Sequence, residues 1–292
     1  MTATLRQRLQ RGVIVVPGVP SALLARLAQQ VGFEAIYLSG AAVANNLTGM
    51  PDIGLIARAE LVQQTAYVAQ AVRLPIVVDA DTGFGGPLGV ERTVRDLEQA
   101  GAAAIQIEDQ TDPKRCGHLA GKRLISPEEM AAKIRAAVQA RRSPELLIIA
   151  RTDARAVEGM RGALARARRY FAAGADMIFP EALESAAEFA QFARSIQAPM
   201  LANMTEFGRT PLIPAAEFGR MGYAIVIFPM TALRAMLQAA EEAFTVLKQE
   251  GTQARILPRL QTRAELYRLL DYAGFEQRET AALTPAKRRP KR

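Results

Sequence analysis

The only cysteine and the only histidine of this 292-residue sequence lie two positions apart, within the run Lys114-Arg115-Cys116-Gly117-His118. Two carboxylates, Glu108 and Asp109, stand shortly before this run. A lone cysteine is most often an inert buried residue, but these neighbours are too polar for a core. Positive charge nearby lowers the pKa of a thiol from ~8.5 towards neutrality, so the thiol can give or take a proton. The segment therefore predicts a reaction centre.

Two further carboxylates, together with Glu108, predict a metal site. Asp79 and Asp81 are two apart on an extended segment, so their side chains face the same way, and Glu108 follows the next predicted strand. Three carboxylates suit Mg²⁺ or Mn²⁺, which also bind water and substrate oxygens. Zinc is disfavoured because the sequence has one histidine and one cysteine. The alternative for a single aspartate is a helix cap or an ion pair with an arginine.

Arg151 ends a predicted strand, where a buried guanidinium needs an acidic partner. A substrate carboxylate would bind it through two parallel hydrogen bonds, and an ion pair with Glu181 is the alternative. None of the six lysines lies in or at the end of a predicted strand, which disfavours Schiff-base chemistry. An enzyme that breaks carbon–carbon bonds on this frame would then need a metal. The run from Gly83 to Gly86 lacks the lysine of a phosphate-binding loop and is interpreted as a mobile loop that admits substrate.

These side chains must be positioned by a repeating pattern of a helix, a glycine and a short apolar strand. The glycines suit left-handed helix caps, and unbroken apolar runs are typical of parallel strands that are covered on both faces. The four clearest such glycines are Gly32, Gly101, Gly174 and Gly222. Eight apolar runs are present, over residues 13–16, 35–38, 75–79, 103–107, 146–150, 176–179, 199–202 and 224–228.

Eight alternating units predict an α/β fold of the (β/α)₈ TIM-type barrel class, whose active site lies where the strands end. A doubly wound open sheet is the alternative, but no Gly-x-Gly-x-x-Gly motif opens a helix after a strand. Extra C-terminal helices are expected over residues 231–249 and from about Thr262. No linker divides the chain, so we expect one domain over residues 1–272 and a basic, disordered tail over residues 273–292.

Composition limits the classes of protein. No apolar run approaches the ~20 residues of a membrane span, and the N-terminal segment lacks the pattern of a signal peptide. A single cysteine permits no internal disulfide, which favours a cytoplasmic location. Of the 37 basic residues, five lie in the last six positions, and the other 32 against 29 acidic residues leave only +3. Nucleic-acid binding through this basic tail is the alternative from a different functional class, but the tail has no interleaved aromatic residues.

The motifs as a set resemble those of the isocitrate lyase and phosphoenolpyruvate mutase superfamily. The resemblance spans the chain from Pro17 to about Tyr272, and the part after Glu250 is similar to the methylisocitrate lyase branch. Its most specific motifs are the Cys-Gly-His run and Asp79-Ala80-Asp81-Thr82-Gly83-Phe84-Gly85. Other matching runs are Tyr37-Leu38-Ser39-Gly40, Ala150-Arg151-Thr152-Asp153-Ala154, Phe179-Pro180-Glu181 and Asn203-Met204-Thr205-Glu206-Phe207-Gly208.

The resemblance implies a helix-swapped barrel in a homo-oligomer, a dimer of dimers. It also implies Mg²⁺-dependent cleavage of a small carboxylate, 2-methylisocitrate, to pyruvate and succinate in propionate catabolism. A dimethylmalate lyase, an oxaloacetate-cleaving enzyme and, less favoured, a phosphonate mutase are the alternatives in the superfamily. We expect neither a nucleic acid nor a membrane as partner.

The resemblance also implies roles for individual residues of this sequence. Asp79 and Asp81 would hold the metal, with Glu108 assisting directly or through water. Cys116 would protonate the carbanion, His118, Arg115 and Arg151 would stabilise carboxylate charge, and Tyr37 is a candidate base. The expected substrate contacts are Ser39, Gly40, Ala41, Cys116, Gly117, Arg151, Glu181, Asn203, Thr205, Arg234 and Arg263.

Overall fold

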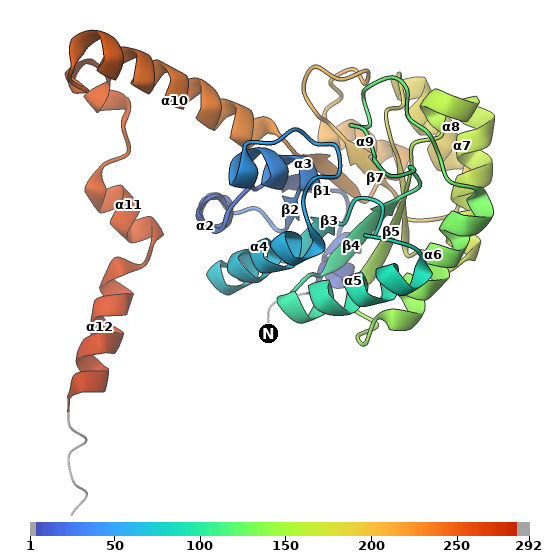
Figure 1. Ribbon diagram of the computed structural model, residues 1–292, viewed down its shortest axis with the longest axis horizontal. Coiled ribbons are helices and arrows are strands. Elements are labelled where there is room, and N and C mark those ends of the chain that lie inside the picture. The colour runs from blue at the N-terminus through green and yellow to red at the C-terminus, as the bar shows by residue number, and fades with distance from the viewer. Residues whose placement is uncertain (1–3, 285–292) are drawn as a thin grey trace, which may run out of the picture. The chain divides into compact units, whose positions relative to one another are not determined.

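The computed structural model describes residues 4–284, and within them eight strands alternate with helices (Figure 1). The strands are β1 (Ile14–Pro17), β2 (Ile36–Leu38), β3 (Ile76–Asp79), β4 (Ala104–Glu108), β5 (Leu147–Thr152), β6 (Met177–Pro180), β7 (Leu201–Asn203) and β8 (Ile225–Phe228). Each apolar run predicted from the sequence forms one of these strands, with its ends moved by at most two residues.

The strands are parallel and follow one another around a barrel. Strands β2 to β6 form one sheet in chain order, and β1, β8 and β7 form a second sheet. Isolated parallel bridges from Gly18 to Tyr37 and from Ile178 to Met200 link the two sheets at both junctions. The fold is the predicted (β/α)₈ TIM-type barrel, with all strands ending on the same side.

Helices surround the strands (Figure 1). They are α1 (Leu5–Leu9), α2 (Ala22–Val31), α3 (Gly40–Val43), α4 (Arg58–Ala71), α5 (Pro87–Ala100), α6 (Pro127–Ala140), α7 (Arg155–Ala172), α8 (Ala186–Ser195) and α9 (Ala215–Met221), with a π-helical turn at Ala44–Thr48. Gly32, Gly101 and Gly222 end three of these helices with φ of 99°, 106° and 95°, as their predicted role as left-handed caps requires.

Two apolar clusters hold the barrel together. One fills the lumen with inward-facing side chains such as Tyr37, Ile149 and Phe179, and Leu5 of α1 joins this cluster. The other lies between the strands and the surrounding helices. Because apolar packing fills the barrel, polar groups that act on a substrate are confined to the ends of the strands.

The chain divides after Met236 into two compact units. Helix α10 (Thr231–Glu250) begins in the first, and the second also holds a 3₁₀ turn (Ala254–Arg259), α11 (Arg263–Leu269) and α12 (Tyr272–Leu283). Helix α12 occupies residues that the sequence assigned to a disordered tail, so that assignment is corrected over these residues. The basic residues from Lys287 onward lie outside the described part of the chain.

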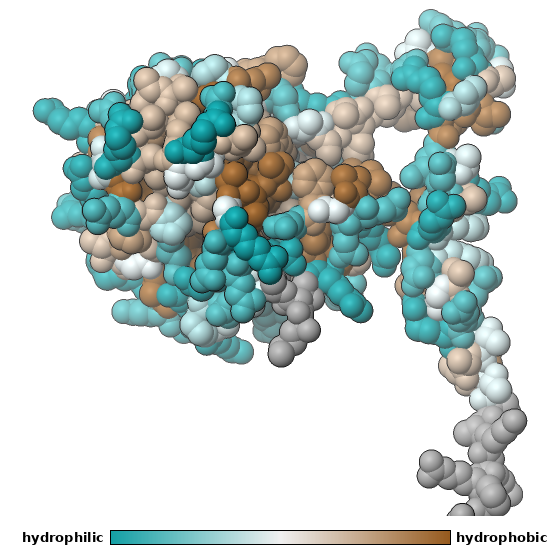
Figure 2. Space-filling model, turned by 180° about the vertical axis from the view of Figure 1, so that it is seen from behind, coloured by the Kyte–Doolittle hydropathy of each residue, from teal (hydrophilic) through white to brown (hydrophobic). Residues whose placement is uncertain are grey.

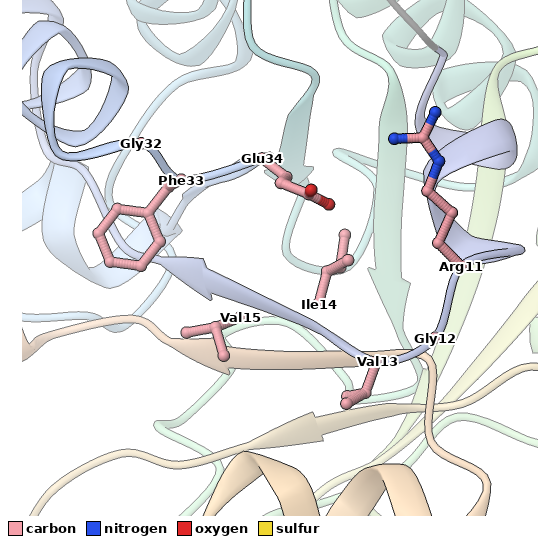
Figure 3. A pocket seen from close by; sticks show the side chains of 8 residues that line it. All are labelled: Arg11, Gly12, Val13, Ile14, Val15, Gly32, Phe33 and Glu34. Atoms are coloured by element: carbon pink, nitrogen blue, oxygen red, sulfur yellow. The ribbon is translucent and has the colours of Figure 1, made fainter.

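None of the helices among residues 4–284 combines the length and the apolar character that a membrane crossing requires. The larger hollows of the first unit lie where strands begin. One of about 340 Å³ is lined by Arg11, Val13 and Val15 at the start of β1 and by Phe33 and Glu34 before β2 (Figure 3). It holds one arginine and one glutamate among apolar side chains, and none of the predicted site residues lies in it.

Candidate active site

The polar residues predicted at the strand ends meet around a small cavity of about 60 Å³. Its lining combines side chains that follow β2, β3, β4, β5, β6, β7 and β8. The lining residues are Tyr37, Ser39, Ala41, Asp52, Asp79, Lys114, Cys116, Gly117, His118, Arg151, Glu181, Asn203, Thr205, Ile227, Pro229 and Met230. Of the predicted site residues in the first unit, Gly40, Asp81, Glu108, Arg115 and Arg234 do not line it.

Gly117 brings the cysteine loop against the strand ends. A Cβ atom at this buried position would lie 2.3 Å from Oε1 of Glu181 and 2.4 Å from a guanidinium nitrogen of Arg151. Side-chain atoms do not approach this closely, so only glycine allows the loop to close here. The Gly of the Cys-Gly-His run is thus explained by its contact with two predicted substrate-binding residues.

His118 is held between two loops. Its Nδ1 accepts a hydrogen bond from the backbone N–H of Arg209 at 3.1 Å, and its Nε2 lies 3.2 Å from Oε1 of Glu181. Because Nδ1 is an acceptor, a neutral ring carries its proton on Nε2, facing the carboxylate. His118 therefore joins the loop after β4 to the loop after β7.

The thiol of Cys116 is free and partly buried. Burial raises its pKa, and a hydrogen bond from the backbone of His118 only partly opposes this. The predicted lowering of this pKa by nearby cations is therefore wrong. Arg115 is exposed and directs its guanidinium towards the carbonyl of Ala120, away from the cavity. At neutral pH the side chain is a protonated thiol, which suits a proton donor rather than a nucleophile.

Arg151 is almost fully buried among acids. Its guanidinium lies 2.9 Å from Asp153, 3.2 Å from Glu108 and 3.6 Å from Glu181, and it stacks over the ring of Phe179. Burial favours the neutral form of Glu181, but Arg151 and the hydrogen bond from His118 outweigh it and lower the pKa of Glu181. Arg151 can thus form the proposed ion pair with Glu181 and also bind a substrate carboxylate.

The predicted metal ligands are buried and close to one another along β3 and β4. Asp79 accepts hydrogen bonds from the backbone of Gly40 (3.2 Å) and from the amide of Gln106 (2.9 Å). Asp81 adopts a left-handed backbone conformation with φ of 48°, which is uncommon outside glycine and typical of strained functional sites. Burial raises the pKa of Asp81 to about 6 and also raises the pKa of Glu108. These raised pKa values indicate that the positive charge near the two carboxylates does not offset the effect of their burial.

Two cations pair with the acids. Lys114 lies 2.8 Å from Asp81, and Arg151 pairs with Glu108. Among residues 4–284 no three His, Cys, Asp or Glu side chains form a group that could hold a metal ion in this arrangement. The three-carboxylate metal site therefore stays a prediction. Oε1 of Glu108 is nevertheless buried without a hydrogen bond, and Oδ1 of Asp81 has only the ion pair with Lys114. Such oxygens fit Mg²⁺, which keeps several waters and needs only one or two carboxylates.

The structure adds Asp52 to the site, a residue that the sequence analysis overlooked. Asp52 lines the cavity and pairs with the ammonium group of Lys114. It lies in the irregular segment between the π-helical turn and α4, so no strand end marked it. The signal for Asp52 in the sequence was the Pro51-Asp52 pair, which is a polar break after an apolar helical stretch.

Tyr37 and Ser39 have structural partners of their own. The phenol of Tyr37 donates a 2.6 Å hydrogen bond to Gln106, and burial raises its pKa well above the usual range. A phenol that keeps its proton is a poor base, so the candidate role of Tyr37 as base is not supported. Ser39 caps α3 by accepting from the backbone N–H of Ala42. Both side chains still face the cavity.

Two further predicted substrate contacts are Arg234 and Arg263. Arg234 is nearly half exposed, lies 3.3 Å from Glu206 and stacks on Phe207. Arg263 is the first residue of α11 in the second unit, and its predicted substrate contact stays a prediction.

Comparison with known proteins gives consistent matches over nearly the whole chain. The profile of the phosphoenolpyruvate phosphomutase family matches residues 5–248. A 2-methylisocitrate lyase of Aeropyrum pernix is 57% identical over 92% of this chain and 87% of its own, and that of Bacillus subtilis is 49% identical over 90% and 87%.

Solved structures of the same superfamily share the fold. The structure of a 2,3-dimethylmalate lyase is 36% identical with a TM-score of 0.91, covering 98% of both chains. A phosphonopyruvate hydrolase in complex with oxalate and Mg²⁺ is 28% identical with a TM-score of 0.87, covering 97% of this chain and 100% of its own. The chain belongs to the phosphoenolpyruvate phosphomutase family, within the superfamily that includes isocitrate lyase.

Proposed function

We propose that this protein is a carbon–carbon lyase that cleaves 2-methylisocitrate to pyruvate and succinate, with Mg²⁺ as cofactor, in propionate catabolism. The observation that carries the proposal is the meeting of a protonated thiol, a buried guanidinium and strand-end carboxylates around one cavity. The high identity to 2-methylisocitrate lyases over most of the chain supports the choice of substrate.

The charged residues suit a substrate with several carboxylates. Arg151 offers a planar guanidinium. The side chain of Asn203 lies near this group because both contact Glu181. Oδ1 of Asn203 is buried without a hydrogen-bond partner in the protein, so it can accept from a substrate hydroxyl or carboxylic acid. We therefore assign Arg151, Glu181 and Asn203 to substrate binding, with Ser39, Ala41, Gly117 and Thr205 completing the walls.

Asp79 and Asp81 would hold Mg²⁺, with Glu108 assisting through water. The bound ion would supply positive charge that acidifies the substrate hydroxyl and stabilises the oxygen that becomes the ketone of pyruvate. The chain's own contribution is the arrangement of oxygens: Gly40 and Gln106 fix Asp79, Oδ1 of Asp81 pairs with Lys114, and Oε1 of Glu108 is buried without a hydrogen bond.

Cys116 delivers a proton to carbon. The substrate hydroxyl gives its proton to a general base, the carbon–carbon bond breaks, and its electron pair remains on the succinate fragment. The thiol then donates its proton to that carbon, which forms the new C–H bond and leaves a thiolate to be reprotonated. The raised pKa of Cys116 keeps the proton in place until the carbanion forms. The free thiol that this step needs also agrees with the proposed cytoplasmic location.

Related acids are the main alternatives. The fold is shared with a 2,3-dimethylmalate lyase at 36% identity. The decisive experiment measures Mg²⁺-dependent release of pyruvate or the corresponding oxo acid from 2-methylisocitrate, isocitrate, 2,3-dimethylmalate and oxaloacetate. We expect the highest kcat/KM with 2-methylisocitrate, and at least tenfold preference for another acid would overturn the assignment.

We further propose that the enzyme is a homo-oligomer, with a dimer of dimers as the expected state. On α2, Leu23, Leu27 and Val31 form an exposed apolar stripe, and on α10 Leu237 and Phe244 do the same. Figure 2 shows hydrophobic surface of this kind on the molecule. Exposed stripes at helical spacing are typical of association surfaces. Light scattering after gel filtration tests the assembly, and a Phe244→Asp variant should shift it towards smaller species.

A further inference from the structure

The cysteine loop ends in a buried lysine whose contacts the proposed reaction does not use. The side chain of Lys122 is 1% exposed, and its ammonium group donates to the carbonyl of Gly117 and to Oδ1 of Asp153, the latter at 2.8 Å. A buried ammonium group is costly unless it is paired and hydrogen-bonded, so these contacts form only while the loop lies on the barrel.

The partner of this lysine is a rigid part of the strand end. The carboxylate of Asp153 is fully buried and also accepts from Nε of Arg151 at 2.9 Å. Its backbone N–H donates to Asp109, which in turn accepts from the hydroxyl groups of Thr152 and Tyr170. Asp153 is thus held in place through its backbone N–H, and its carboxylate accepts from both Arg151 and Lys122.

We infer that Lys122 and Asp153 form a clamp that holds Gly117 down on Arg151 and so sets the position of the Cys116 thiol. Through its two carboxylate oxygens, Asp153 connects Arg151, which is assigned to substrate binding, with the loop that carries the proton donor Cys116. Lys122 and Asp153 touch neither the cavity nor its contents, so they act as positioning residues. The inference rests on the proposed function for its catalytic consequence.

The size of the cavity shows why such a clamp matters. About 60 Å³ holds roughly two water molecules, far less than a branched tricarboxylate. Substrate entry requires the loop to lift, and lifting Gly117 breaks either its contact with Lys122 or the contact of Lys122 with Asp153. The clamp therefore sets how much of the time the thiol is covered and how accurately it returns. A misplacement of about 1 Å can lower the rate by about a hundredfold.

Cys116 is the only cysteine, so its alkylation reports loop opening directly. In Lys122→Met, a long uncharged side chain replaces the lysine. We expect the rate of Cys116 alkylation by iodoacetamide, without substrate or metal, to rise at least tenfold. We expect kcat to fall ten- to a hundredfold while KM changes less than threefold. The matched control is Arg123→Met, an exposed cation in the same loop, which should change neither quantity.

The alternative is that the pair only stabilises the fold. It predicts a lower melting temperature with an unchanged alkylation rate in the folded state, and that result in Lys122→Met would overturn the clamp. If Lys122→Met does not fold, Lys122→Gln and Asp153→Asn, which keep polar groups in place, decide by the same readout. Alkylation needs no turnover, so a clamp that fails is distinguishable from a wrong substrate assignment.

Discussion

The backbone N–H of Arg209 donates a hydrogen bond to Nδ1 of His118 across 91 residues of sequence. The guanidinium of Arg209 also reaches the carbonyl of His118 at 3.3 Å. Since the same imidazole faces Glu181 through Nε2, the loop after β7 fixes both the ring's orientation and its tautomer. The orientation of His118 therefore depends on residues that the Cys-Gly-His run does not contain.

Gly208→Ala should disturb this contact selectively. A Cβ at Gly208 would lie 2.5 Å from Nδ1 of His118, so the two loops could not meet as they do. We expect kcat to fall about a hundredfold, as for other misplaced catalytic groups, with the melting temperature nearly unchanged. Gly86→Ala is the control, because nothing lies within 4 Å of its added Cβ. Normal turnover in Gly208→Ala would show that the contact is dispensable.

Cys116→Ser should remove most of the activity without unfolding the protein. A hydroxyl is a far weaker acid than a thiol, and positioned proton transfer contributes about 10²–10⁴ in rate. We expect kcat for pyruvate release to fall by about that factor, with circular dichroism and the melting temperature preserved. Near-normal turnover would remove Cys116 from the role of proton donor.

The alkaline limb of the pH profile should report the raised pKa of Cys116. A proton donor is active below its pKa and loses activity as pH rises through it. Because burial raises the pKa of this thiol, activity should persist beyond the pH at which an ordinary cysteine ionises. The pH dependence of Cys116 alkylation by iodoacetamide measures the same titration in the free enzyme. A midpoint below that of free cysteine would contradict the assignment.

Tyr170→Phe should destabilise the support behind β5. The Tyr170 hydroxyl donates to Asp109 at 2.8 Å and accepts from Arg166 at 3.0 Å in a fully buried cluster. Leaving these groups unpaired costs about 1–3 kcal/mol, which urea or thermal unfolding can measure. Tyr67→Phe is the control, since Tyr67 is half exposed and surface changes are usually within about 0.5 kcal/mol. Equal stability of the two variants would contradict the network's importance.

Removal of divalent cations should abolish turnover and lower stability. A ligand that binds only the folded state stabilises it, by about 2.7 kcal/mol at a hundred times its Kd. We expect Mg²⁺ to raise the melting temperature of the wild type and of Glu34→Gln, whose exposed carboxylate lies at the start of β2. In Asp81→Asn the shift should disappear. An equal shift in Asp81→Asn would place the ion elsewhere.

The barrel was predictable because each of its units carries a local signal. Continuous apolar runs and helix-ending glycines are properties of neighbouring residues, and the eight strands follow them closely. The ends of those strands then indicated Asp79, Arg151, Glu181 and Asn203 as residues that meet, since a parallel barrel collects the ends of its strands on one side.

Other features depend on contacts between distant segments. The direction of the Cys116 pKa shift was predicted from its charged neighbours in sequence, but Arg115 points away and burial dominates. Lys114 belongs to the same run, yet its partners Asp52 and Asp81 come from other loops. Neither the closure of these loops nor the pairing of the acids with these cations has a signature in local sequence.

The packing of Leu5 in the apolar cluster of the lumen has a consequence for how such an enzyme can change. Its stabilising contacts are made at the base of the strands, whereas every reacting group is carried by the opposite rim. Selection for a new acid can therefore remodel the rim loops while the base keeps the architecture intact. A directed-evolution library confined to residues 41–56 and 204–213 should consequently retain a high fraction of folded members while altering which acids are accepted.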